Sequence, residues 1–252
     1  MTHSQSNILT FGDAEEKDRR GQLFDLFKNC PIPADEIFLN LGLFLTPQTL
    51  SRILFIDFLY RQILEVQGIV IEFGCRWGQN LALFSALRGI YEPFNRLRKV
   101  VGFDTFEGFF KTSEKDGNKV GPGMYSVTPA YDGYLQRLMD LQEKESPLAH
   151  LRKHAIVKGD ATVRIKEYLE RNPETVVALA YFDLDLFEPT RDCLLAIKDR
   201  LTPGSILGFD ELNDPVTPGE TAAFKEVFGF HRWGIRRYRY NSRTSYVVFD
   251  RS

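Results

Sequence analysis

The stretch that decides the fold of this chain is Val70-Ile71-Glu72-Phe73-Gly74-Cys75-Arg76-Trp77-Gly78-Gln79-Asn80. It predicts a buried strand that ends in a carboxylate, then a tight glycine turn, then a helix from Leu81 to Arg88. The first glycine permits backbone angles that other residues resist, and the second lets a ligand lie against the main chain. Such a turn after the first parallel strand is typical of a nucleotide-type site.

Strand-like and helix-like segments alternate along the rest of the chain. After the first strand, at 69–73, the runs expected to be strands are 99–104, 155–160, 176–185 and 205–211. The segments expected to be helices between them are 80–89, 131–144, 161–171 and 189–201. Two further strands, 233–240 and 244–250, predict an antiparallel hairpin at the end of the chain. The prediction is an α/β fold with a doubly wound, mostly parallel, seven-stranded Rossmann-like sheet.

Two segments do not follow this alternation of strands and helices. Residues 1–45 are expected to form a tail, loosely ordered up to about residue 20, and then an apolar lid or interface segment at 37–45. Residues 46–252 would form the catalytic domain, whose helix from Pro47 is capped by Thr46. The glycine-rich insertion at about 110–131 is too long for a plain connection and is expected to be a lid over the ligand.

Composition narrows the class of protein. The chain has 252 residues, 43% of them hydrophobic and 26% charged, with a net charge of -2, which gives no reason to expect nucleic-acid binding. The three cysteines show no metal spacing. Without an apolar run long enough to cross a bilayer, we expect no membrane association and a cytoplasmic location. The basic tract between Arg232 and Arg239 is either a solvated strand edge or a site for an anionic substrate group.

Carboxylates end five successive apolar runs, and parallel strands bring such ends to one edge of the sheet. They are Glu72, Asp104, Asp160, Asp183 and Asp210. Asp104 suits a ribose hydroxyl pair, although a local turn bond would also explain it. Asp160 suits the amine of an adenine, or the cap of the helix that begins at Ala161.

The last two strand ends carry grouped acids, Asp183 with Asp185 and Asp210 with Glu211. Grouped carboxylates repel one another unless a cation or a shared proton intervenes. A hard divalent ion such as Mg²⁺ resolves this problem. Helix capping and a salt bridge to Arg191 or Lys198 form the alternative explanation.

Five motifs together resemble the class I S-adenosylmethionine-dependent methyltransferases and, among them, the macrocin O-methyltransferase (TylF-type) family of sugar O-methyltransferases. The motifs are IEFGCRWG (71–78), GFDTFEGF (102–109), KGD (158–160), YFDLDLFEPT (181–190) and GFDE (208–211). The resemblance covers about residues 46–228.

This resemblance implies roles for particular residues. The cofactor site for S-adenosylmethionine would comprise Glu72, Gly74, Arg76, Trp77, Gly78, Asn80, Asp104, Thr105, Phe106, Asp160 and Ala161. In it, Asp104 would hold the ribose and Phe106 would lie against the adenine. Asp183 would be the general base, and Mg²⁺ would bind to Asp183, Asp210 and Glu211. The family often has Asp-Asp where this chain has Asp210-Glu211.

The expected reaction is Mg²⁺-assisted methylation of a sugar hydroxyl, on a nucleotide sugar such as a TDP-deoxysugar or on a glycosylated natural product. One alternative is methylation of a catechol-like phenol. Another is an NAD-dependent oxidoreductase, against which the turn lacks the G-x-G-x-x-G pattern. The apolar segment 37–45 leads us to expect a homo-oligomer, a dimer or larger.

Overall fold

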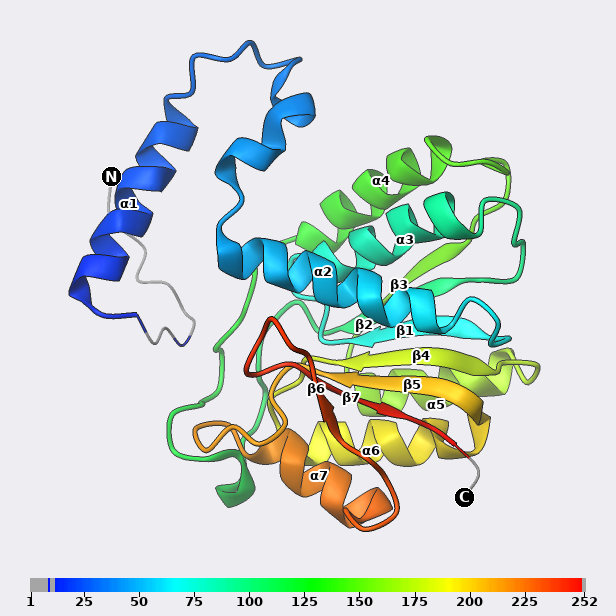
Figure 1. Ribbon diagram of the computed structural model, residues 1–252. Coiled ribbons are helices and arrows are strands. Elements are labelled where there is room, and N and C mark those ends of the chain that lie inside the picture. The colour runs from blue at the N-terminus through cyan, green and yellow to red at the C-terminus, as the bar shows by residue number, and fades with distance from the viewer. Residues whose placement is uncertain (1–8, 10–11, 251–252) are drawn as a thin grey trace.

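Seven strands form one sheet in the order β3-β2-β1-β4-β5-β7-β6 in the computed structural model, which describes Leu9 and residues 12–250 (Figure 1). The parallel strands are β1 (Ile69–Phe73), β2 (Val100–Asp104), β3 (His154–Lys158), β4 (Val177–Phe182) and β5 (Leu201–Phe209). The antiparallel end comprises β7 (Ser245–Val248) and β6 (Arg236–Arg237). The predicted seven-stranded, mostly parallel sheet with a terminal hairpin is therefore confirmed.

Helices cover both faces of the sheet (Figure 1). One face packs against α2 (Pro47–Gln62), α3 (Gln79–Tyr91) and α4 (Tyr131–Lys144). The other face packs against α5 (Ala161–Arg171), α6 (Phe187–Ile197) and α7 (Gly219–Phe228). The remaining helices are α1 (Ala14–Lys28) and the 3₁₀ segments η1 (Ile37–Phe44), η2 (Glu114–Asp116) and η3 (Lys198–Arg200).

Aromatic packing fixes the centre of the sheet. Phe103, Phe73, Phe182 and Phe209 come from β2, β1, β4 and β5, and neighbouring rings lie 5.0–5.4 Å apart between centroids. All four side chains are fully buried. A row of rings across four strands ties the strands into one layer and leaves their carboxyl ends level at one edge.

Several element boundaries differ from those expected from the sequence. The last part of the supposed loose tail, from Ala14 to about residue 20, is in fact the start of α1, because the Asp13 side chain caps it and i,i+4 ion pairs support it. Residues 1–8, 10 and 11 of that tail lie outside the described residues. The helix expected at 189–201 begins at Phe187 and gives way to η3 before Leu201, where β5 starts. α7 was not predicted. The strand expected at 233–240 is reduced to two residues.

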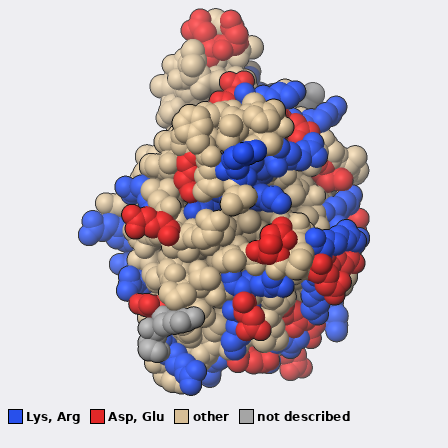
Figure 2. Space-filling view, turned by 90° about the vertical axis from the view of Figure 1, so that its right-hand side faces the viewer, with Lys and Arg blue, Asp and Glu red and all other residues tan. Residues whose placement is uncertain are grey.

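An N-terminal arm, residues 12–45, projects from the body of the molecule (Figure 1). Neither α1 nor η1 contains a buried residue. No single helix among the described residues is long and apolar enough to cross a membrane; η1 and α2 together pass that test of length and composition, but they are bent by 111°. On the face seen in Figure 2, basic and acidic side chains are interspersed and part of the molecule projects at the top.

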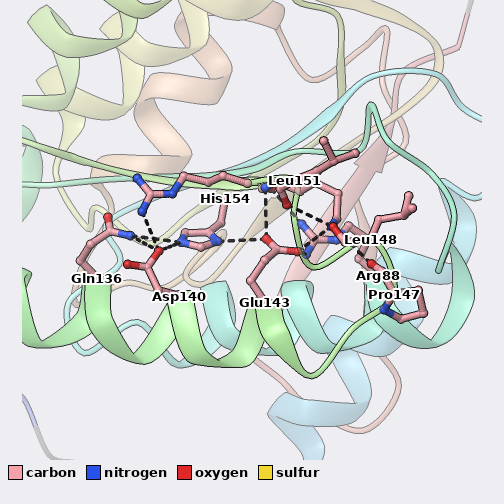
Figure 3. Close-up of polar contacts among 10 residues, drawn as sticks. Arg88, Gln136, Asp140, Glu143, Pro147, Leu148, Leu151 and His154 are labelled. Carbon is pink, nitrogen blue, oxygen red and sulfur yellow. Dashed lines mark hydrogen bonds and ion pairs between the residues drawn. The ribbon is translucent and has the colours of Figure 1, made fainter.

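A buried ionic cluster joins α3, α4 and β3 (Figure 3). Glu143 on α4 accepts a hydrogen bond from Arg88 on α3 (2.6 Å) and forms an ion pair with Lys153 (2.8 Å). Its other oxygen contacts His154 Nδ1 at 3.0 Å. Burial alone would raise the pKa of Glu143, but the hydrogen bonds from Lys153 and His154 and the charge of Arg88 lower it to about 2.

The cluster predicts how stability depends on pH. Because the folded-state pKa of Glu143 lies below its ordinary value of 4.5, its stabilisation is present above pH 4.5 and is lost as the pH falls towards 2. A Glu143→Gln variant should be less stable than the wild type by about 3 kcal/mol at pH 7, and the difference should shrink below pH 4.5. Denaturant unfolding at several pH values measures this. A difference that stayed constant from pH 7 to pH 3 would contradict the ionic explanation.

Candidate functional site

The strand order reverses between β1 and β4, and a cavity of about 460 Å³ opens at the carboxyl ends of these strands. Crevices at such reversal points are the usual ligand sites of open α/β sheets. Nine of the residues predicted for the site line this cavity: Gly74, Arg76, Asp104, Thr105, Asp160, Ala161, Asp183, Asp210 and Glu211. The structure thus brings the glycine turn and the grouped acids into one space.

The glycine turn is set against the acid on β4. Gly74 has φ of +84°, and a Cβ at this position would lie 1.9 Å from the carbonyl oxygen of Asp183. Gly78 has φ of +77°, and a Cβ there would lie 2.5 Å from the Leu135 side chain. Both positions therefore require glycine, one to let two chain segments meet and one to begin α3 against α4.

The two acids expected at the nucleoside end take part in local bonds as well as lining the cavity. Asp104 accepts hydrogen bonds from the backbone N–H groups of Arg76 (2.7 Å) and Phe106 (2.5 Å). Burial raises the pKa of Asp104, and these hydrogen bonds oppose that rise. Asp160 caps α5 through the N–H of Thr162 (2.9 Å). The local turn bond of Asp104 and the helix cap by Asp160 are therefore confirmed, and a carboxylate that makes them can accept further bonds from a ligand.

Five predicted site residues do not line the cavity: Glu72, Trp77, Gly78, Asn80 and Phe106. Phe106 is 5% exposed and packs in the core formed with α2, α3 and α4, which disagrees with the expectation that its ring faces the cavity. Its positive φ of 62° turns the chain at this point. Glu72 is buried beneath the turn, where burial and the neighbouring Asp183 raise its pKa well above the usual value.

Asp183 and Asp210 share one cation, the guanidinium of Arg52 on α2. Arg52 Nη2 lies 2.7 Å from Asp210 Oδ1 and 3.5 Å from Asp183 Oδ2. Tyr181 Oη also donates a hydrogen bond to Asp210 (2.8 Å). Burial and the charge of Asp210 raise the pKa of Asp183 to about 8. Asp183 therefore holds a proton far more readily than an ordinary aspartate.

A second arginine compensates the neighbouring acids. Arg243 pairs with Glu211 and with Asp214, the latter at 2.9 Å. Asp185, at φ of +58°, has its pKa raised well above the usual range by burial and by the charge of Glu211. Within Leu9 and residues 12–250, no group of three or more His, Cys, Asp or Glu side chains is placed to hold a metal ion.

Arg52 and Arg243 were missed by sequence reasoning. Arg52 stands among apolar positions of α2, and a charged residue there was the available indication of a buried acidic partner. Arg243 lies in the hairpin loop, where nothing in the neighbouring sequence indicated that it would pair with an acid of the site. Leu9 and Tyr125 also line the cavity, so the N-terminal segment and the insertion both reach the site.

The insertion is anchored at its base. Asp116 in η2 is buried and accepts a hydrogen bond from the backbone N–H of Phe187, the first residue of α6 (2.5 Å). Its other oxygen accepts from the backbone and side chain of Ser113. The ammonium of Lys115 lies 3.7 Å from the centroid of the Phe187 ring. The segment is thus attached beside the acids of β4 while Tyr125 extends over the cavity.

Comparison with solved structures identifies relatives of the whole chain. A structure of CalS11, a calicheamicin methyltransferase, has 40% sequence identity and a TM-score of 0.91, covering 99% of this chain and 98% of its own. An apo structure of CalS11, a TDP-rhamnose 3'-O-methyltransferase, has 39% identity and a TM-score of 0.85, covering 96% of this chain and 97% of its own. The chain belongs to the TylF-type family of S-adenosylmethionine-dependent O-methyltransferases.

A more distant structure shares the fold of this methyltransferase. The O-methyltransferase NovP has 15% identity and a TM-score of 0.59 over 80% of each chain. No protein-family model matches the methyltransferase chain, and no curated protein sequence does. Family membership confirms the resemblance drawn from the five motifs and removes the dehydrogenase alternative.

Gly74 gives a test of the site in this methyltransferase. Alanine at this position has both a strained φ and a clash with Asp183, so Gly74→Ala should lower stability by more than about 2 kcal/mol and weaken S-adenosylmethionine binding at least 10-fold. Thermal unfolding and calorimetric titration measure the two effects. The control is Gly133→Ala in α4, where a Cβ meets nothing within 4 Å and stability should be unchanged or rise by up to about 1 kcal/mol. Normal cofactor affinity in Gly74→Ala would contradict this placement of the turn.

Proposed function

We propose that this enzyme transfers a methyl group from S-adenosylmethionine to a hydroxyl of a nucleotide sugar, a TDP-deoxyhexose in the first instance. The observation that carries the proposal is the 40% identity, over nearly the full length of both chains, with CalS11, a TDP-rhamnose 3'-O-methyltransferase. Its support in this chain is one cavity that contains both the glycine turn and the acids of β4 and β5.

The cofactor supplies an electrophilic methyl group when bound. In our proposal Gly74 gives the main-chain approach for its amino-acid end, Asp104 accepts from the ribose hydroxyls, and Asp160 with Ala161 meets the adenine. Arg76, whose guanidinium lies 5.3 Å from the ring of Tyr125, contributes positive charge beside the turn. These contacts orient the donor, and orientation of two reactants is worth up to about 7–11 kcal/mol in favourable systems.

Asp183 is proposed as the general base that accepts the proton of the acceptor hydroxyl. A base works best when its pKa lies near the working pH. Without a bound ion the pKa of Asp183 is raised to about 8, and a cation beside the carboxylate would lower it from there. Arg52 and Tyr181 hold its neighbour Asp210 in place from two sides. The proton moves from the acceptor oxygen to a carboxylate oxygen of Asp183 as the oxygen attacks the methyl carbon; the methyl–sulfur bond breaks, its electron pair stays on sulfur, and S-adenosylhomocysteine leaves.

A divalent ion is the second part of the proposal, with two carboxylates as its protein ligands and not a group of three or more. Mg²⁺ in proteins commonly binds through one or two carboxylates, with water and substrate oxygens completing the shell. Asp183 and Asp210 would hold the ion, with Arg52 moving away from them, and Glu211 would join only if it left Arg243. A bound Mg²⁺ would lower the pKa of a nearby hydroxyl and fix its direction.

The role of Asp183 is tested by Asp183→Asn. The variant should bind S-adenosylmethionine within about 3-fold of the wild type, because the carboxylate faces the acceptor, yet lose at least 100-fold in kcat with TDP-rhamnose because the base is absent. Calorimetry and a methyl-transfer assay give the two values. Full activity in this variant would exclude Asp183 as the base. If the wild type methylated a catechol in preference to TDP-rhamnose, the acceptor would be a phenol and not a sugar.

We also propose that residues 1–45 form an interface and cover segment and that the enzyme is a homo-oligomer. Phe38 and Leu39 in η1 are 79% and 85% exposed, which is unusual for large apolar side chains placed next to each other. Leu9 lines the cavity from the same part of the chain. If η1 packed on a second copy of the chain, Phe38 and Leu39 would be buried while Leu9 remained at the cavity.

The oligomer is tested by light scattering after size exclusion. The wild type should have the mass of a dimer or larger, and a Phe38→Asp, Leu39→Asp double variant should shift towards the monomer, since charge on a buried apolar contact is unfavourable. Ile90→Asp, at a 69% exposed position of α3, is the control and should leave the mass unchanged. A monomeric wild type would contradict the proposal.

A further inference from the structure

We infer that Glu220 is a positioning residue that fixes the separation of Asp183 and Asp210, an inference that rests on the proposed function of these two acids. Glu220 lies in the first turn of α7 and is fully buried. Its Oε1 accepts a hydrogen bond from the backbone N–H of Leu184, and its Oε2 accepts one from that of Glu211, both at 3.2 Å. One side chain therefore joins the ends of β4 and β5.

The two bonded N–H groups belong to the residues that directly follow the two acids. Backbone hydrogen bonds to neighbouring strands fix the main chain of each acid. The N–H of Asp183 donates to the carbonyl of Phe73 (2.9 Å), and the N–H of Asp210 donates to the carbonyl of Phe182 (3.1 Å). Beyond these bonds both strands have ended. A buried N–H without a partner costs about 1–3 kcal/mol, so the next residue on each strand needs an acceptor, and Glu220 supplies both.

The backbone of α7 is placed to allow this. A Cβ on Gly219 would lie 2.3 Å from the carbonyl oxygen of Asp185 and 2.7 Å from the N–H of Phe187. The start of α7 is thus in direct contact with the loop that follows Asp183. This contact sets Glu220 between the two strand ends.

The carboxylate is not explained by packing. A buried carboxylate beside Glu211 and Asp185 is unfavourable, and an uncharged side chain would fill the same volume without that cost. Aspartate would keep the carboxyl group, but its side chain is one methylene shorter and cannot reach both N–H groups from the same backbone position. Glutamine keeps the reach but replaces one acceptor oxygen with an NH₂ group.

These two substitutions separate positioning from charge. We expect both Glu220→Asp and Glu220→Gln to weaken Mn²⁺ uptake, followed by the EPR signal of the free ion, about 10–100-fold, as is typical for residues that orient metal ligands. Affinity for S-adenosylmethionine should stay within about 3-fold. Glu170→Asp on the exposed side of α5 is the matched control and should behave as the wild type. Crystal structures of the wild type and Glu220→Asp should show a changed distance between the carboxylates of Asp183 and Asp210.

Each other result overturns the inference. Wild-type Mn²⁺ affinity in Glu220→Asp, with a loss confined to Glu220→Gln, would leave only a charge effect. A lower Tm with unchanged Mn²⁺ affinity and kcat in the folded fraction would leave only a structural role. If the wild type itself took up no Mn²⁺, the metal part of the proposed function would fail; the carboxylate distance in the Glu220→Asp crystal would then decide, and an unchanged distance would refute the positioning role.

Discussion

The contact between Gly74 and the carbonyl of Asp183 is the constraint on which the rest of this structure depends. It lies where the strand order reverses, so it joins the turn after β1 to the acid after β4. Because no side chain fits between them, the glycine turn and the acid of β4 lie directly against each other. The row of phenylalanines beneath keeps the strand ends level, and it packs in the core that the sheet forms with α5, α6 and α7.

The acids around this contact form a set whose charges must be balanced. Asp183 and Asp210 are balanced by Arg52, which comes from α2 before the sheet begins in sequence. Glu211 is balanced by Arg243, which comes from the hairpin at the other end of the chain. The site is therefore assembled from segments that lie far apart in sequence, and the sheet alone would leave it strongly repulsive.

Much of the fold and part of the site were predictable from local patterns. The strand Ile69–Phe73 and the helices Tyr131–Lys144 and Ala161–Arg171 begin and end where the sequence indicated, because apolar periodicity and capping residues are local properties. Arg243 was not predictable, since its acid partner is 32 positions away and no spacing rule connects them. Phe106 was misplaced because its positive φ turns the ring into the core. The short Arg236–Arg237 strand depends on pairing with β7 and not on its own sequence.

Arg52 and Arg243 also affect how folding of the chain is related to ion binding. In many metalloproteins the unfilled site is a cluster of bare charges, and folding waits for the ion. Here the chain carries its own positive charge into the site, so the polypeptide can complete its fold before any ion arrives. If an ion binds to Asp183 and Asp210 as proposed, its loading would be an exchange of one cation for another. A protein whose site is balanced by its own arginines would then keep its fold while the ion is scarce.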